Sequence, residues 1–153
     1  MNGWTGKLLR ANLSTRVCTV ESSEKYFDYI GGKGMATRIH YDEVPASVKP
    51  FDPESKVVMA IGPNSGSSAP CSGRTTLSFL STFTKGNAVT DAHIGGDIAT
   101  QMKACGYDAI IIEGVSQTPV YLCIRDDKAS VEDATALWGM TTTETTAALC
   151  DKE

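Results

Sequence analysis

Residues 102–114 (MKACGYDAIIIEG) decide the fold of this chain. Their centre, residues 109–112, is one alanine followed by three isoleucines, with Asp108 before the run and Glu113 after it. β-Branched residues in a short apolar run with polar ends are typical of a buried strand, so we expect a core strand over residues 108–113. The run is far too short to cross a bilayer.

A helix is predicted directly before this strand. Ile94, Ile98 and Met102 are spaced so that they share one face of a helix. We expect residues 91–96 to open this helix and the helix to run to about Cys105.

Hairpins dominate the rest of the chain. Two pairs of segments alternate apolar and polar residues around a turn-prone link and are predicted to form hairpins, 7–13 with 17–21 and 120–125 with 129–132. Further strands are expected at 56–61 and 74–81, and further helices at about 24–30, at 35–41 and from 142 onwards. Because strands outnumber helices and hairpins outnumber crossovers, the sequence predicts an α+β domain on a mainly antiparallel sheet.

The composition is that of an ordinary soluble domain. The chain has 153 residues, of which 41% are apolar and 21% are charged, so it can bury a core of its own. Its net charge is −4 without clustering of either sign, which argues against nucleic-acid binding. The first residues lack the features of a signal peptide, so we expect a cytoplasmic protein that is not bound to a membrane.

The cysteines do not form a metal-binding pattern. The five cysteines are widely scattered, and they are Cys18, Cys71, Cys105, Cys123 and Cys150. Since zinc and iron–sulfur sites usually draw neighbouring ligands from one loop, we expect no metal site made by this chain alone.

Two features could bind a ligand. Residues 62–73 form a loop of small residues that leaves backbone amides approachable, and Arg74 at its exit can clamp a phosphate or a planar polar ring. Residues 93–96 (HIGG) are expected at a helix start, where amides and the helix dipole favour an anion. Together they suggest a site for a phosphorylated, planar cofactor, although each alone also fits a structural loop. For His93, a capping or hydrogen-bonding role is preferred over proton transfer.

Residues 31–34 (GGKG) do not form a dinucleotide-binding motif. They follow an expected helix rather than a strand, and Thr37 stands where the third glycine of that motif would be. We expect these glycines to end a helix, with contact to a phosphate as the alternative. His40, in the following helix, is expected on the helix surface.

The order of several segments resembles the aldehyde:ferredoxin oxidoreductase family. The matching blocks are 3–15 (GWTGKLLRANLST), 31–34, 41–45 (YDEVP), the GP…AP..GR pattern of 62–74, the glycine pair 95–96 with 102–114, 119–122 (PVYL) and 137–139 (LWG). The likeness covers essentially the whole chain. Residues 81–87 and 91–93 are most similar to a less-characterised tungsten- or molybdenum-dependent branch.

This resemblance implies a first domain of two facing β-sheets that cradles a tungsten- or molybdenum-bis-pyranopterin cofactor. In such enzymes the metal oxidises an aldehyde to a carboxylate, and a nearby [4Fe–4S] cluster passes the electrons to ferredoxin. The family arginine that lies between pterin and cluster corresponds to Arg74, which follows Gly73. The family's glycine pair near the cofactor phosphates corresponds to Gly95 and Gly96.

The sequence departs from the family at His93. Well-studied members have an asparagine there that helps to hold the magnesium ion bridging the two pterin phosphates. Imidazole is a poorer magnesium ligand than an amide oxygen, because that ion prefers hard oxygen donors. The alternative for His93 is a hydrogen bond to a cofactor phosphate.

Family enzymes are several times longer than this chain. The resemblance therefore implies one pterin-binding N-terminal domain over residues 1–153, incomplete at its C-terminus and inactive alone. Its expected partners are a C-terminal portion or second subunit, which would carry the [4Fe–4S] cluster, and a ferredoxin-like acceptor; a homo-oligomer is a further option. The alternative is a free-standing, non-catalytic module that binds, carries or helps to assemble the cofactor. No catalytic residue is assigned.

Overall fold

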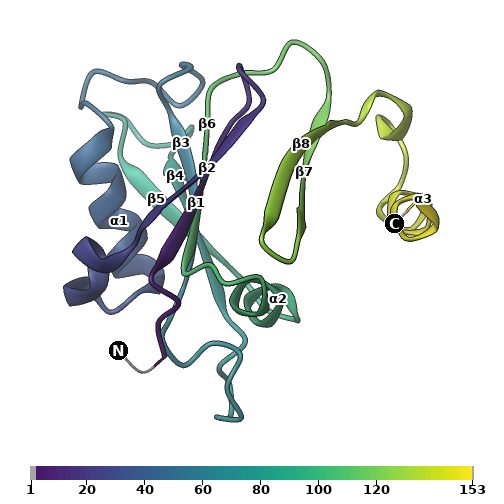
Figure 1. Ribbon diagram of the computed structural model, residues 1–153. Coiled ribbons are helices and arrows are strands. Elements are labelled where there is room, and N and C mark those ends of the chain that lie inside the picture. The colour runs from purple at the N-terminus through teal and green to yellow at the C-terminus, as the bar shows by residue number, and fades with distance from the viewer. Residues whose placement is uncertain (1–2, 153) are drawn as a thin grey trace.

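The computed structural model describes residues 3–152, and its centre is a six-stranded sheet (Figure 1). In spatial order the strands are β2 (Val17–Ser22), β1 (Lys7–Asn12), β6 (Ala109–Glu113), β3 (Lys56–Ile61), β4 (Thr75–Leu80) and β5 (Val89–Ile94). The β1–β6 pair is parallel, and the other neighbours in this sheet are antiparallel. The predicted core strand is confirmed as β6, between β1 and β3.

The apolar run of β6 follows from cover on both faces of the sheet. Ala109 and Ile111 belong to the core cluster under α1 (Gly32–Glu43), whereas Ile110 belongs to the cluster under α2 (Ile98–Ala104). Since successive strand residues point to opposite faces, a strand with two covered faces needs apolar residues at every position.

Different elements cover the two faces. On one face, α1 and the 3₁₀ helix η1 (Glu24–Tyr29) contribute Tyr26, Met35 and Ile39 to the core. On the other face, α2 contributes Ala99 and Met102. This second cluster also receives Leu122, Ile124 and Ala129 from the C-terminal hairpin.

That hairpin is a separate two-stranded sheet of β7 (Val120–Arg125) and β8 (Lys128–Asp133). Asp126 in its tight turn has a φ of 53°, a conformation that aspartate tolerates better than most residues. Both predicted hairpins, the α+β class and the predominance of antiparallel pairing are confirmed. In residues 3–152 the expected second facing sheet corresponds to this two-stranded sheet, which packs against one face of the first.

Beyond the hairpin, η2 (Thr135–Leu137) and α3 (Thr142–Lys152) lie on the far side of β7 and β8 from the large sheet (Figure 1). α3 begins where the sequence predicted it. Within residues 3–152, no helix has the length and apolar character needed to span a membrane.

The prediction of a helix opening at residues 91–96 is wrong. Residues up to Ile94 form β5, which pairs along its whole length with β4, and α2 begins only at Ile98. The Ile94–Ile98–Met102 spacing therefore combines a strand end with a helix face. Pairing of residues 89–94 with β4, which precedes them in the chain, decided their structure against the helical spacing of the sequence.

Of two predictions about α1 and its start, one holds in part and one is wrong. A helix does end directly before the glycines of residues 31–34, since η1 ends at Tyr29, but α1 already begins at Gly32, with Gly31 as its N-cap at a φ of 71°. A Cβ on Gly34 would lie 2.2 Å from the Tyr29 carbonyl oxygen, so the glycine lets the helix start against η1. His40 is buried against the sheet with 1% exposure, and burial lowers the pKa of its imidazole.

Candidate functional site

Loops from distant parts of the chain meet at the end of the sheet where β3 and β5 finish and β4 begins. A Cβ on Gly73 would lie 3.2 Å from the Gly96 carbonyl oxygen, so the exit of the loop 62–73 touches the turn after β5. A Cβ on Gly66 would lie 3.3 Å from Cβ of Lys103 in α2. The small-residue loop therefore touches α2 at Gly66 and the turn after β5 at Gly73, while residues 66–71 are exposed to solvent.

Arg74 lies against the glycine pair predicted to share its site. A Cβ on Gly95 would be 3.9 Å from the guanidinium carbon of Arg74, so a glycine at this position leaves space beside the guanidinium. Arg74 is exposed, and it makes no ion pair or hydrogen bond with any residue of the described part of the chain. The structure thus brings Gly73, Arg74, Gly95 and Gly96 together, with a cation free to meet an anion.

His93 lies in β5, two residues before Gly95, and not at a helix start. Its side chain is 48% exposed, and its Nε2 is 2.9 Å from Oδ2 of Asp91. Its Nδ1 is 3.2 Å from Oγ1 of Thr76, the residue opposite it on β4. Asp91 is also 2.6 Å from Nζ of Lys33, and the hydrogen bond from Lys33, ahead of the weaker contribution from His93, lowers the pKa of Asp91.

Asp91, Thr76 and Lys33 were not singled out from the sequence. Thr76 and His93 become neighbours through the β4–β5 register, which is a non-local pairing. Lys33 lies in the first turn of α1. This turn is close to Thr76, since a Cβ on Gly32 would lie 3.5 Å from the Thr76 hydroxyl. If residues 89–94 are read as a strand, period-2 alternation places Asp91 and His93 on one face, which is the signal that was available.

A buried carboxylate fastens the N-terminal segment to this end of the sheet. Asp108 has no exposed surface, and it accepts hydrogen bonds from the amides of Thr5 and Gly6, each at 2.9 Å. It also accepts one from the Ser23 hydroxyl at 2.7 Å and one from Lys103 at 3.2 Å. Burial acts to raise the pKa of Asp108, but these donors together hold it below its usual value.

The N-terminal segment that Asp108 holds also contacts the loop of the candidate site. Lys103 donates to the Gly3 carbonyl at 2.8 Å, and a Cβ on Gly3 would lie 2.8 Å from the Pro63 carbonyl oxygen. Asp108 therefore anchors a segment that packs directly on the small-residue loop.

A second charged cluster lies at the opposite end of the sheet. Arg10 contacts Glu21, Glu43 and Glu113, with Nη1 at 2.9 Å from both Glu43 and Glu113. Lys56 also pairs with Glu113. Burial raises the pKa of each of Glu43 and Glu113, but the neighbouring cations bring both below their usual values. The cluster is internally paired, so it reads as a structural network.

The structure also locates the cysteines and other potential metal ligands. Residues 3–152 contain no group of three or more His, Cys, Asp or Glu side chains arranged to hold a metal ion. The five cysteines form no disulfide among residues 3–152, and they lie in different elements or loops.

Comparison with known proteins is consistent along the chain. Residues 8–153 match the family described as the N-terminal domain of aldehyde ferredoxin oxidoreductase. The tungsten-containing aldehyde ferredoxin oxidoreductase of Pyrococcus furiosus is 36% identical over 151 residues, which are 97% of this chain and 25% of the relative. The enzyme of the same name from Thermococcus kodakarensis is 38% identical over 151 residues, with the same coverage of 97% and 25%.

Two further similar proteins have names other than aldehyde ferredoxin oxidoreductase. The WOR-like subunit of an aliphatic sulfonate oxidoreductase from Pyrococcus furiosus is 34% identical over 92% of this chain and 23% of its own length. A solved structure of the active site complex BamBC of benzoyl coenzyme A reductase, bound to 1,5-dienoyl-CoA, superposes with a TM-score of 0.93. It is 32% identical and covers 99% of this chain and 23% of that one.

The chain thus spans about a quarter of the length of the relatives it matches, always at full or nearly full coverage of its own residues. The matched region includes the loop, Arg74 and the glycine pair that the fold brings together. This chain belongs to the aldehyde ferredoxin oxidoreductase family and corresponds to its N-terminal domain.

Proposed function

We propose that residues 1–153 form the pterin-cofactor-binding domain of a tungsten- or molybdenum-dependent oxidoreductase that oxidises aldehydes to carboxylates. The observation that carries this proposal is the contact of Gly73 and Arg74 with Gly95 and Gly96. Two glycine-lined backbone segments and an unpaired arginine suit a planar, phosphorylated ligand. The relatives' names supply the tungsten and the aldehyde.

The cofactor would supply the two-electron chemistry, and this chain's residues would bind and orient it. Arg74 is free to form a bidentate contact with a phosphate or a pterin edge. The backbone at Gly95 and Gly96 can approach a ligand closely because neither residue has a side chain of its own, and Gly96 has a φ of 86° that disfavours other residues. The sequence-based assignment of Gly73, Arg74, Gly95 and Gly96 to the cofactor is retained on this geometry.

Electron transfer would need groups from outside this domain. The cysteines here are dispersed, so a [4Fe–4S] cluster is assigned to a C-terminal portion or second subunit, from which electrons would pass to a ferredoxin-like acceptor. A magnesium ion between cofactor phosphates would likewise need oxygen ligands. Two relatives are named as parts of assemblies, which supports a partner for this domain.

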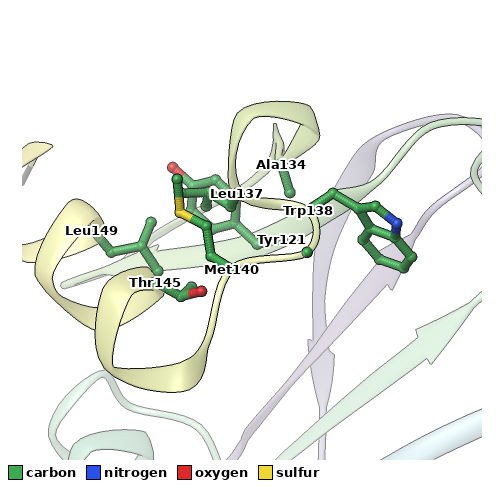
Figure 2. Close-up of a pocket in the computed structure, with 8 residues that line it drawn as sticks. Tyr121, Ala134, Leu137, Trp138, Met140, Thr145 and Leu149 are labelled. Carbon is green, nitrogen blue, oxygen red and sulfur yellow. The ribbon is translucent and has the colours of Figure 1, made fainter.

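An apolar groove offers a surface for that partner. It has a volume of about 540 Å³ between the hairpin and α3, and its lining includes Tyr121, Met140 and Leu149. Figure 2 shows Leu149 of α3 on the same side as Met140, with the Trp138 ring directed away from them. Trp138 is 78% exposed and Met140 is 45% exposed, so both leave apolar surface beside the groove that a partner could cover.

The test counts tungsten, molybdenum and iron per polypeptide. The chain is purified anaerobically from a host that makes the cofactor, both alone and in complex with its C-terminal portion or partner subunit. Tungsten or molybdenum in the complex supports the proposal, and metal in the chain alone, without iron, favours the alternative of a free-standing carrier module. A complex without either metal contradicts both.

Arg74→Ala tests the site within that complex. Because Arg74 is exposed and makes no hydrogen bond or ion pair with the described residues, the variant is expected to fold with unchanged stability and to lose most of its pterin. Arg38→Ala, on the surface of α1 and paired with Asp42, is the matched control that keeps the cofactor. Full cofactor content in Arg74→Ala would remove Arg74 from the site.

A further inference from the structure

His93 has both ring nitrogens engaged by protein groups. Nε2 faces the Asp91 carboxylate at 2.9 Å, and Nδ1 faces the Thr76 hydroxyl at 3.2 Å. A carboxylate only accepts hydrogen bonds, so a neutral imidazole would carry its proton on Nε2 and accept at Nδ1 from the Thr76 hydroxyl. The two partners come from the strand of His93 itself and from its neighbour β4.

Direct binding of a phosphate by His93 is unfavourable in this arrangement. To donate to a phosphate, Nε2 would have to leave Asp91, and the phosphate would then lie beside a carboxylate of the same sign of charge. To donate from Nδ1, the ring would have to lose the Thr76 contact and change its tautomer. Arg74 has neither obstacle, because it has no partner among the described residues.

The contacts of His93 instead connect three elements. Asp91 holds His93 and also pairs with Lys33 at the beginning of α1. Thr76 touches His93 and lies 3.5 Å from the Cβ position of Gly32 in the same helix turn. Since Gly95 follows His93 by two residues, this set of contacts fixes the end of β5 on which the glycine pair is carried.

We propose that His93 is a positioning residue rather than a ligand of the cofactor, held by Asp91 and Thr76 so that β5 presents Gly95 and Gly96 beside Arg74. This inference rests on the proposed pterin site. It assigns the anion contacts to Arg74 and the backbone, and it gives Asp91 and Thr76 a role in cofactor retention without any contact to the cofactor. It also replaces the expectation of a hydrogen bond from His93 to a phosphate.

The two roles of His93 predict opposite signs for variants of Asp91. If His93 bound a phosphate directly, removing the competing carboxylate would leave cofactor affinity unchanged or raise it. If His93 positions β5, Asp91→Ala lowers cofactor affinity roughly three- to tenfold, the effect of one or two lost hydrogen bonds. Asp91→Asn, whose amide oxygen still accepts from Nε2, restores most of this loss. Asp28→Ala, an exposed aspartate on η1, is the matched control.

Affinity is measured as tungsten or molybdenum retained per polypeptide by the complex during dilution. Loss in Asp91→Ala with recovery in Asp91→Asn supports the proposal, and equal or greater retention in both variants overturns it. If the parent complex holds no cofactor, the proposed function fails, and that result is distinct from either outcome here.

A second measurement needs no cofactor. The chain contains two histidines, so ¹⁵N-histidine labelling gives few imidazole signals, and His93→Gln identifies those of His93. We expect the ¹⁵N shifts of His93 in the 153-residue chain to show the tautomer with its proton on Nε2, and a larger share of the other tautomer in Asp91→Ala. A parent chain in which neutral His93 carries its proton on Nδ1 overturns the proposal, whatever the result for Arg74.

Discussion

Replacing Asp108 with alanine tests whether one carboxylate fastens the N-terminal segment to the sheet. The side chain is fully buried and accepts four hydrogen bonds, from Thr5, Gly6, Ser23 and Lys103. Hydrogen bonds to charged groups contribute about 1.5–3 kcal/mol each, but water entry and relaxation of the donors prevent simple addition. Breaking a buried charged contact by removing one partner costs about 3–5 kcal/mol, so we expect that loss in the free energy of unfolding.

The assay is equilibrium urea unfolding of the chain, followed by circular dichroism. Asp28→Ala is the control, since exposed substitutions usually change stability by less than about 0.5 kcal/mol. A loss below about 1 kcal/mol for Asp108→Ala would refute the view that these four donors depend on the carboxylate. Exposure of the Gly3–Pro63 contact in the variant, seen as faster amide exchange in residues 62–73, would locate the effect in the site loop.

The pH dependence of Asp108 gives a second check of the same reasoning. Its pKa in the folded chain lies below the usual 3.8, so the folded state favours the charged form. The stabilisation is therefore fully present above the unfolded pKa and is lost as the pH falls below about 3.8 through the folded pKa. The stability difference between the parent chain and Asp108→Asn should shrink on acidification; a difference that grows would contradict the assignment.

Three other predictions concern single side chains. Gly34→Ala should destabilise the chain by about 1–3 kcal/mol, because the 2.2 Å approach of its Cβ to the Tyr29 carbonyl oxygen outweighs the better helix propensity of alanine; urea unfolding would show a gain instead if helix propensity decided. Arg10→Lys should cost about 1–3 kcal/mol in the same assay, because an ammonium group cannot make the several directed contacts that the guanidinium makes with three glutamates, and equal stability would contradict this. Trp138→Ser should leave stability within about 0.5 kcal/mol but weaken binding of the C-terminal portion or partner subunit in sedimentation experiments, and unchanged binding would exclude Trp138 from the contact surface.

The sequence was sufficient wherever burial leaves a local pattern. β6 is covered on both faces, so its apolar run identified it without knowledge of its neighbours. The hairpin of β7 and β8 combines alternation with the turn at Asp126, and both signals are local. The structure of these segments can therefore be predicted from a few neighbouring residues.

Prediction failed where pairing or packing with distant residues decided the structure. β5 is an edge strand with Asp91 and His93 on one face, so its alternation is weak and the helical spacing of Ile94 with later residues was more visible. His40 is buried because α1 lies on the sheet, and a single histidine does not report that packing.

The same contrast separates the parts of the candidate site. Gly73, Arg74, Gly95 and Gly96 were assigned through chemistry and family likeness, and the structure places them together. The partners of His93 depend on the β4–β5 register, so neither Asp91 nor Thr76 could be connected with the site from the sequence. Residues proposed to contact a ligand can be picked out by their type, whereas residues that hold them in place can be identified only from the folded structure.

Residues that stabilise the fold and residues proposed to bind the cofactor can be distinguished by experiment, because the former are buried and the latter are exposed. Asp108 is buried and fully partnered, so its loss should lower stability and, through the N-terminal segment, disturb the small-residue loop of the proposed site. Arg74 is exposed and unpartnered within residues 3–152, so its loss should reduce cofactor retention without a change in unfolding. Asp91 lies between these cases, since it is half-buried and pairs with Lys33 and His93 on the strand that leads into the glycine pair. A variant set in which cofactor loss tracks unfolding free energy at all three positions would mean that the domain responds only through its stability; independent changes at Arg74 and Asp91 would mean that this end of the sheet is built as a binding site.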